Sequence, residues 1–250
     1  MKNLIQAHFP IDKMPLKVTF FFDTISPYTY FAWANLLRYK KVWDLNIVLK
    51  PMFLGGVMSG TGNQPPAMLA PRAVFTANDV MRNAALYNVP VLASPGNFFS
   101  EAAKKVLTVQ RMLVGRMIDG ASEAEMETLL NNCFYAIHSD PKFRTEANDL
   151  VLNDATILTV LRASGLSETD AARSLKRAGD ADVKNALQVN TKEAIECGAY
   201  GSPTLLIHGG KAPYYDGTNP WLVFGSDRFE QIAFVCGLPY LGANPDKAKM

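Results

Sequence analysis

The stretch from Val18 to Phe31, VTFFFDTISPYTYF, constrains the fold more than any other part of the chain. Residues 19–22 are β-branched or aromatic, as in a strand buried on both faces. Ser26 is a favoured helix N-cap, and Pro27 follows at the first helical position, where its missing N–H costs nothing. The stretch therefore predicts a strand that ends at Asp23, a short turn, and a helix that starts at Ser26.

The hydroxyl of Ser26 is the first candidate functional group. A helix N-terminus carries a positive field, so a hydroxyl placed there can hold an anion. Our hypothesis is that this anion is a thiolate. The alternative is that Ser26 only caps its helix, because Ser-Pro is common at strand-to-helix turns.

Composition restricts the classes of function. The chain has 250 residues, 48% of them apolar, which suits one large domain or one domain inserted into another. The net charge is +2 and no block of Lys and Arg occurs, which argues against nucleic acid as the main partner. No apolar run approaches the roughly 20 residues that span a bilayer, and the N-terminus lacks a signal-peptide pattern.

The cysteines and histidines do not form a recognisable site. The cysteines are Cys133, Cys197 and Cys236, with no Cys-x-x-Cys, so neither a zinc knuckle nor a redox dithiol is predicted. We expect each cysteine to be a buried free thiol in a helix, and the default compartment to be reducing. The histidines, His8, His138 and His208, are isolated from one another, and we predict no metal.

The first third of the chain predicts a βαβ unit over residues 16–51, with strands at 16–23 and 45–50 and a helix from Pro27 to about Tyr39. The following segment, 51–66, is rich in Gly and Pro and is expected to be irregular. It is not a phosphate loop, because no Gly-Lys-Ser/Thr follows. Asn63 is its notable polar side chain, with a turn residue as the alternative interpretation.

The rest of the chain predicts a helical block and then two strands and a helix. Residues 71–197 are expected to be almost wholly helical, with starts at Pro71, Ser100, Ser122, Asn153 or Asp154, Ser167 and Asp180. Strands are predicted at 204–208 and 221–224, and Ser226 is expected to open a last helix.

This order, βαβ then helices then ββα, predicts an α/β thioredoxin-like fold with an inserted all-helical domain. The expected thioredoxin-like domain is discontinuous, over residues 16–62 and 199–240. The inserted helical domain covers 63–198, and residues 1–15 and 241–250 are terminal extensions.

Five short motifs carry a resemblance to one family. They are FFDTISPY at 21–28, GNQPP at 62–66, AND at 77–79, YGSPT at 200–204 and FGSDR at 224–228. In this order and spacing they resemble the kappa class of glutathione transferases. That class shares its fold with bacterial disulfide oxidoreductases and with glutathione-dependent 2-hydroxychromene-2-carboxylate isomerases. The resemblance covers residues 18–237.

The resemblance implies a glutathione site. Ser26 would hydrogen-bond the glutathione sulfur, and Pro27 and Tyr28 would form the wall beside it. Asn63 would contact the glycyl end. Thiol–disulfide exchange is not expected, because Ser26 stands where the oxidoreductases begin their Cys-x-x-Cys.

Two further segments complete the implied site. Ser202 precedes Pro203, which is a cis-proline in the family, and the Ser202 backbone would pair with the cysteinyl main chain of glutathione, as in strand addition. Ser226 and Asp227 would hold the γ-glutamyl group. Asp227 has an alternative interpretation as a first-turn acid that only serves its helix. Where the family often has a lysine for the glycyl carboxylate this chain has Ala73, and Arg72 is the candidate substitute.

The implied activity is conjugation of the glutathione thiolate to a hydrophobic electrophile, with peroxide reduction as a side activity. A glutathione-dependent isomerase and a non-catalytic glutathione-binding or chaperone-like protein are the alternatives. The family also implies a homodimer. The tripeptide Ala248-Lys-Met250 resembles a peroxisomal address, which predicts peroxisomal location, with the mitochondrion as alternative.

Overall fold

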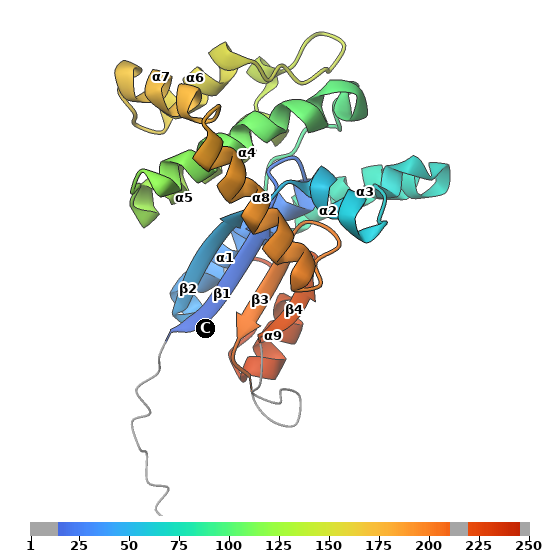
Figure 1. Cartoon of the computed structure of the whole chain (residues 1–250). Helices are drawn as coiled ribbons and strands as arrows, with labels where there is room; N and C mark the ends of the chain where they lie inside the picture. The colour runs from blue at the N-terminus through green and yellow to red at the C-terminus, as the bar shows by residue number, and fades with distance from the viewer. Residues whose placement is uncertain (1–14, 211–219, 246–250) are drawn as a thin grey trace, which may run out of the picture.

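A computed structural model of the chain describes residues 15–210 and 220–245 (Figure 1). Most of the predicted terminal extensions and the address at 248–250 lie outside these residues. The division into domains stays a prediction, although the elements described below follow the expected order.

A four-stranded sheet forms the centre of the fold, with strand order β2-β1-β3-β4. The strands are β1 (Leu16–Phe22), β2 (Leu45–Pro51), β3 (Thr204–His208) and β4 (Trp221–Phe224). β1 is parallel to β2 and antiparallel to β3, which is antiparallel to β4. Helix α1 (Pro27–Trp43) connects β1 to β2, and α9 (Phe229–Cys236) follows β4. This βαβ plus ββα order confirms the expected thioredoxin-like arrangement.

Strand β1 is buried on both faces of the sheet, as its sequence predicted. Val18, Phe20 and Phe22 belong to the main core, with residues of α1 and α9. Phe21 points to the opposite face, where it packs with Val57 of α2 (Leu54–Thr61) and Ala194 of α8 (Ala181–Glu196). Figure 1 shows α8 on the near side of the sheet and α1 and α9 behind it.

Helices fill most of the chain between β2 and β3. After α2 come η1 (Pro66–Met68), α3 (Ala70–Leu86), the π-helical turn η2 (Phe98–Ala102), α4 (Ala103–Ile118), α5 (Glu123–His138), η3 (Pro141–Phe143), α6 (Asp154–Ala163), α7 (Glu168–Arg177) and α8. The predicted caps at Ser122, Asn153 and Ser167 are confirmed, because each side chain accepts a hydrogen bond from its helix's first turn.

The irregular segment predicted for residues 51–66 is partly wrong, because α2 lies within it. Its glycines permit close packing against α8. A Cβ at Gly56 would lie 3.2 Å from Cγ2 of Thr191, and one at Gly60 would lie 2.8 Å from Cδ1 of Ile195. These glycines lie where two helices pack closely, which the prediction of an irregular segment missed.

The predicted cap at Ser100 is also wrong. Ser100 lies inside η2, and its hydroxyl donates to the carbonyl of Asn97, 3.3 Å away. The chain enters α4 through this wider turn, and Asn97 occupies the position before it.

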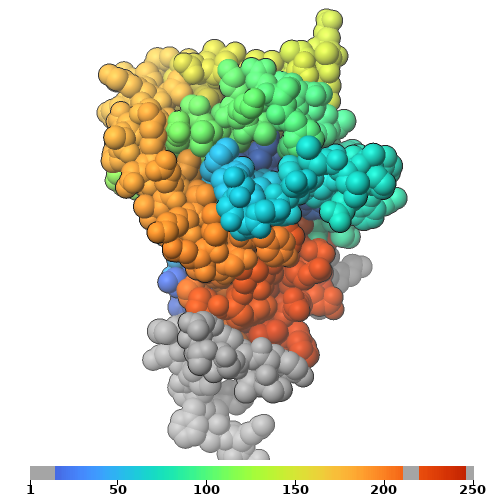
Figure 2. All heavy atoms as spheres, turned by 45° about the vertical axis from the view of Figure 1, so that its right-hand side comes forward, coloured from blue at the N-terminus to red at the C-terminus, as the bar shows by residue number. Residues whose placement is uncertain are grey.

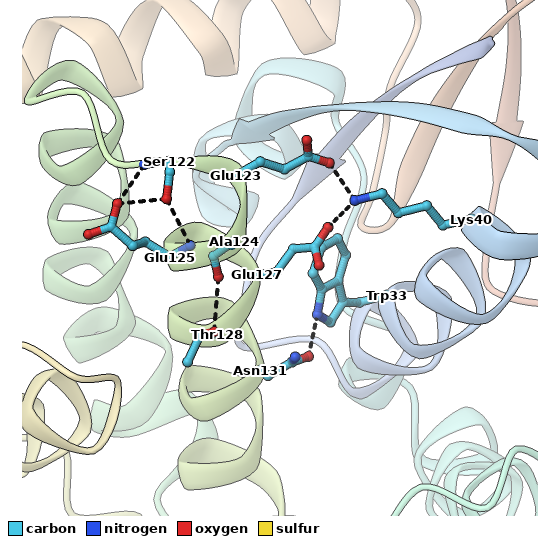
Figure 3. Close-up of polar contacts among 9 residues, drawn as sticks. All are labelled: Trp33, Lys40, Ser122, Glu123, Ala124, Glu125, Glu127, Thr128 and Asn131. Carbon is cyan, nitrogen blue, oxygen red and sulfur yellow. Dashed lines mark hydrogen bonds and ion pairs between the residues drawn. The ribbon is translucent and has the colours of Figure 1, made fainter.

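Helix α5 packs along α1 through polar contacts as well as the core (Figure 3). The Trp33 indole N–H donates to Oδ1 of Asn131 over 2.7 Å. Lys40 forms ion pairs with Glu123 and Glu127. These contacts hold α1, the helix that Ser26 begins, against the helical block.

Candidate functional site

The predicted site residues gather at one end of the sheet because of its topology. Phe21 of β1 lies opposite Thr204, the first residue of β3, and Thr204 lies opposite Phe224, the last residue of β4. Three segments therefore lie together at the same end of the sheet: the residues after β1, those before β3 and those after β4. In Figure 2 dark-blue atoms from the early part of the chain are visible at the base of a hollow between cyan α2 and α3 and green α4.

Ser26 is the N-cap of α1, as predicted. Its Oγ accepts a hydrogen bond from the Thr29 N–H at 3.3 Å and donates to the Ser202 carbonyl at 3.1 Å. The residue is only 7% exposed. Its hydroxyl proton therefore already points along a defined direction, toward the segment that precedes β3.

Ser202 joins this site through its backbone and its side chain. The Ser202–Pro203 bond is cis, as the resemblance implied. The Ser202 Oγ accepts from the Asp23 N–H at 2.9 Å and shares a hydrogen bond of 2.7 Å with Oγ1 of Thr29. The Ser202 carbonyl already accepts a hydrogen bond from the Ser26 hydroxyl. Within residues 15–210 and 220–245, the Ser202 N–H has no hydrogen-bond partner.

Asp23 is a site residue that the sequence interpretation missed. Its carboxylate is fully buried and accepts from the Ile25 N–H at 3.1 Å and the Leu54 N–H at 2.8 Å. Burial raises the Asp23 pKa to about 6, against the opposing effect of these two N–H groups. The only signal in the sequence was an acidic residue directly after a buried strand.

Gln110 and His138 also reach the turn before Ser26, and neither was predicted as a site residue. The Gln110 amide bonds the backbone and hydroxyl of Thr24, and Nε2 of His138 lies 2.8 Å from the Thr24 carbonyl. Burial lowers the His138 pKa to about 4, so the ring is neutral near pH 7. The sequence offered one indication of this role, because Gln110 is a polar residue within the apolar face of α4.

Pro27 and Tyr28 follow Ser26 and are half-buried. The Tyr28 hydroxyl donates to Oδ2 of Asp79 on α3 over 2.7 Å. Burial, then Asp79 and then Asp227, raise the pKa of the Tyr28 phenol, which is therefore neutral. Tyr28 thus joins the start of α1 to α3 at the edge of the site.

Asn63 lies just after α2 and is exposed. Its Nδ2 donates to the Tyr200 carbonyl at 2.7 Å, and its Oδ1 accepts from the Gln64 N–H. The residue therefore stabilises the approach to Ser202, two residues after Tyr200. A contact with the glycyl end of glutathione stays a prediction.

The segment after β4 differs from the expectation. Helix α9 begins at Phe229 with Arg228 at the cap position, so Ser226 does not open it. Gly225, at φ 95°, turns the chain, and a Cβ there would lie 2.9 Å from Oδ1 of Asp227. The extra turn residues delay the helix.

Ser226 and Asp227 differ in their surroundings. Ser226 is buried, and its carbonyl accepts from the Tyr87 hydroxyl at 3.3 Å. Asp227 is exposed, with Oδ2 2.8 Å from the Arg228 guanidinium. Since Ser226 is not at the helix start, its backbone cannot act as part of a helix N-terminus toward a carboxylate. Arg72, the candidate for the glycyl carboxylate, lies exposed in the first turn of α3.

The expectation of buried thiols is confirmed for Cys133 and wrong for the other two cysteines. Cys133 is buried, Cys236 is half-buried, and Cys197 is exposed at the end of α8. Across the described ranges, no group of three or more His, Cys, Asp or Glu residues could hold a metal ion. The same ranges contain no helix that is both long and apolar enough to cross a membrane.

Comparisons with known proteins place this geometry in context. Residues 17–234 match the family model described as DSBA-like thioredoxin domain. Glutathione S-transferase kappa 1 of Rattus norvegicus is 29% identical over 92% of this chain and 95% of its own length. The Homo sapiens protein of the same name is 28% identical over 93% and 96%. A solved 2-hydroxychromene-2-carboxylate isomerase superposes with a TM-score of 0.65 at 21% identity, over 86% of this chain and 92% of the other. These matches confirm the resemblance and the fold predicted from the sequence.

Proposed function

This chain belongs to the DSBA-like thioredoxin domain family, and on that premise we propose that it is a glutathione transferase of the kappa class. The curated relatives that carry this name match nearly the whole chain. The observation that carries the proposal is the Ser26 hydroxyl, held at the start of α1 and 3.1 Å from the Ser202 carbonyl. The residue proposed to bind the glutathione sulfur therefore contacts the residue whose backbone would bind the peptide.

Ser26 and its helix supply the stabilisation that a thiolate needs. A free thiol has a pKa of about 8.5, and lowering it by about two units requires about 2.7 kcal/mol. A hydrogen bond to a charged acceptor contributes about 1.5–3 kcal/mol, and a helix N-terminus about 0.3–1. On binding, the hydroxyl proton of Ser26 turns from the Ser202 carbonyl to the sulfur, so one hydrogen bond is exchanged for a stronger one.

The backbone of Ser202 would receive the cysteinyl main chain of glutathione. Its N–H can donate, and its carbonyl has a second lone pair beside the bond from Ser26. The Asn63 amide would break its hydrogen bond to the Tyr200 carbonyl and form one to the glycyl end of glutathione. Asp227 would exchange Arg228 for the ammonium of the γ-glutamyl group.

The reaction is attack of the bound thiolate on an electrophilic carbon. A carbon–sulfur bond forms, the leaving group departs with its electron pair, and the thiol proton goes to solvent. Ser26 acts as a donor to sulfur. It is not a nucleophile, because its hydroxyl contacts Ser202 and Thr29, neither of which can remove its proton.

The test is a titration of bound glutathione followed by its ultraviolet thiolate absorbance. We expect a bound-thiol pKa about two units below that of free glutathione, and turnover of a chlorodinitrobenzene-type electrophile with the same pH dependence. Glutathione methylated on sulfur is the control and should bind without the absorbance. Tight binding without turnover would favour the non-catalytic alternative, and turnover only of an aromatic pyruvate isomerase substrate would favour the isomerase.

The proposal includes a homodimer, as the resemblance implies. Support comes from apolar side chains exposed on η1, on α3 and at the residue between them: Met68, Leu69, Val74, Phe75, Met81 and Leu86. Light scattering on the purified chain should give twice the chain mass. Phe75→Lys should shift the mass toward that of one chain, and an unchanged mass would remove α3 from the interface.

A further inference from the structure

The turn that carries Ser26 is held by a glutamine of the helical block. Gln110 lies on α4 and is fully buried. Its Oε1 accepts from the N–H and the hydroxyl of Thr24, at 3.3 Å and 3.1 Å. Its Nε2 donates to the carbonyls of Phe22 and Met52, at 2.8 Å and 2.9 Å.

All the hydrogen-bonding capacity of this amide is directed at the end of the sheet. A glutamine has two donor hydrogens and two acceptor lone pairs, and the four contacts of Gln110 use each of them. The partners come from the last residue of β1, the residue after β2, and the turn between β1 and α1. A buried amide satisfied in this way allows one arrangement of its neighbours, because any shift leaves a buried polar group unpaired.

His138 of α5 holds the other side of the same turn. The Thr24 carbonyl can only accept, so Nε2 of His138 carries the proton of this 2.8 Å hydrogen bond. The ring packs against Tyr30 and Phe134, with centroids 5.8 Å and 6.3 Å away. Both backbone polar groups of Thr24, two residues before Ser26, are therefore bonded to the helical block.

We propose that Gln110 is a positioning residue that sets the direction of the Ser26 hydroxyl toward the glutathione sulfur. This inference rests on the proposed function. A hydrogen bond weakens steeply as its angle falls, and displacements of about 1 Å can cost large factors in rate. The helical block thus contributes to the chemistry without touching glutathione.

The experiment compares Gln110→Met with Val109→Ala. Val109 is a buried core residue next to Gln110 on α4, and its truncation should lower stability because it removes apolar contacts in the core. For each variant we would measure the melting temperature, glutathione binding by calorimetry, the thiolate titration and the pH dependence of kcat/KM.

We expect Gln110→Met to raise the bound-thiol pKa by about one unit and to lower kcat/KM near pH 6.5 about tenfold. KM for glutathione should change by less than about twofold, since Ser202 remains in place. Val109→Ala should lower the melting temperature and leave the thiol pKa unchanged. Gln110→Glu, which keeps one donor and one acceptor when protonated, should give an intermediate shift.

The groups that titrate near this turn, Asp23 and His138, are controlled by repeating the titrations in a Ser26→Ala background. There Gln110→Met should add no further shift, because the hydroxyl it positions is absent. An equal shift in both backgrounds, or none in either, would overturn the inference.

Two outcomes separate this inference from the proposed function. If the wild-type protein shows no bound thiolate, the proposed function fails. If the wild type shows it and Gln110→Met is identical, only the positioning role fails. Should Gln110→Met not fold, Thr24→Val removes the hydroxyl bond to Oε1 alone, and a smaller shift in the same direction is expected.

Discussion

The two ends of the proposed glutathione site are built differently. At the sulfur end, Ser26 and Ser202 are 7% and 9% exposed and bonded directly to each other. At the peptide end, which would hold the glycyl and γ-glutamyl groups, Asn63 and Asp227 are exposed. Asn63 donates a hydrogen bond to the Tyr200 carbonyl, and Asp227 forms an ion pair with Arg228. The buried end is fixed before any ligand arrives, whereas the exposed residues must change partners. We therefore expect changes at the buried end to alter chemistry, and changes at the exposed ends to alter affinity.

The largest expected effects concern two buried titratable groups, and the first is the carboxyl of Asp23. Its pKa is raised from 3.8 to about 6, so the folded protein keeps this proton to a higher pH than the unfolded chain does. Stability from this group is present below about pH 4 and is lost as pH rises through 6, by roughly 3 kcal/mol. Asp23→Asn should therefore gain that much relative to wild type between about pH 4 and 7, in urea unfolding. Parallel curves for the two proteins would contradict a buried, ionising Asp23.

His138 gives the matched contrast, because its sign is opposite. Its pKa is lowered from 6.5 to about 4, so the unfolded chain binds the proton first as pH falls. The stability from neutral His138 is present above about pH 6.5 and is lost as pH falls toward 4. His138→Phe, which keeps a ring against Tyr30 and Phe134, should remove that loss. In the wild type the opposite pH dependences of Asp23 and His138 partly cancel. The plot of unfolding free energy against pH should therefore be flatter for the wild type than for Asp23→Asn or His138→Phe.

The next effect is at the hydroxyl itself. Ser26→Ala should raise the bound-thiol pKa by about two units and lower kcat/KM near pH 6.5 about 100-fold. KM for glutathione should change little, because the backbone of Ser202 still pairs with the peptide. Ser100→Ala is the control, since Ser100 is exposed on η2 and its hydroxyl bonds only the Asn97 carbonyl of the same turn among the described residues. Identical pH–rate profiles for wild type and Ser26→Ala would remove the distinction between the two ends.

The buried end also shows what the sequence could predict. The strands at 204–208 and 221–224 have the predicted bounds, because β-branched and apolar runs between turn residues are local signals. Ser26 as N-cap is equally local. Contacts of Gln110 with Thr24 join residues 86 apart, and those of Asp23 with Ser202 join residues 179 apart. No local pattern encodes them.

Where local patterns were misleading, packing explains the difference. Gly56 and Gly60 belong to a helix because α8 approaches closely, at Thr191 and Ile195. Gly225 delays α9, which displaced the predicted helix start from Ser226. For Gly56 and Gly60 the residue type was consistent with two structures, and a helix distant in sequence selected one of them.

At the exposed γ-glutamyl end, Asp227→Asn should raise KM for glutathione about tenfold with kcat unchanged. The loss is limited because the Asp227 carboxylate exchanges one cation, Arg228, for another. Glu230→Gln, another acid in the same exposed segment, is the control and should leave KM unchanged. A fall in kcat with constant KM would instead assign Asp227 to the chemical step.

The smallest effect is expected at Asn63. Its amide already donates to the Tyr200 carbonyl at 2.7 Å, so a new bond to the glycyl end replaces an existing one. The net gain of such an exchange is a fraction of one hydrogen bond, about 0.5–1 kcal/mol, so Asn63→Ala should raise KM about threefold. Asn78→Ala, exposed on α3, is the control, and calorimetry with glutathione measures both. If Asn63→Ala instead raised the thiol pKa as Ser26→Ala should, the exposed residue would be acting through Tyr200 on the backbone of Ser202. The sulfur end and the peptide end would then be energetically coupled. The Tyr200 carbonyl that accepts from Asn63 is two residues before the Ser202 carbonyl that accepts from Ser26.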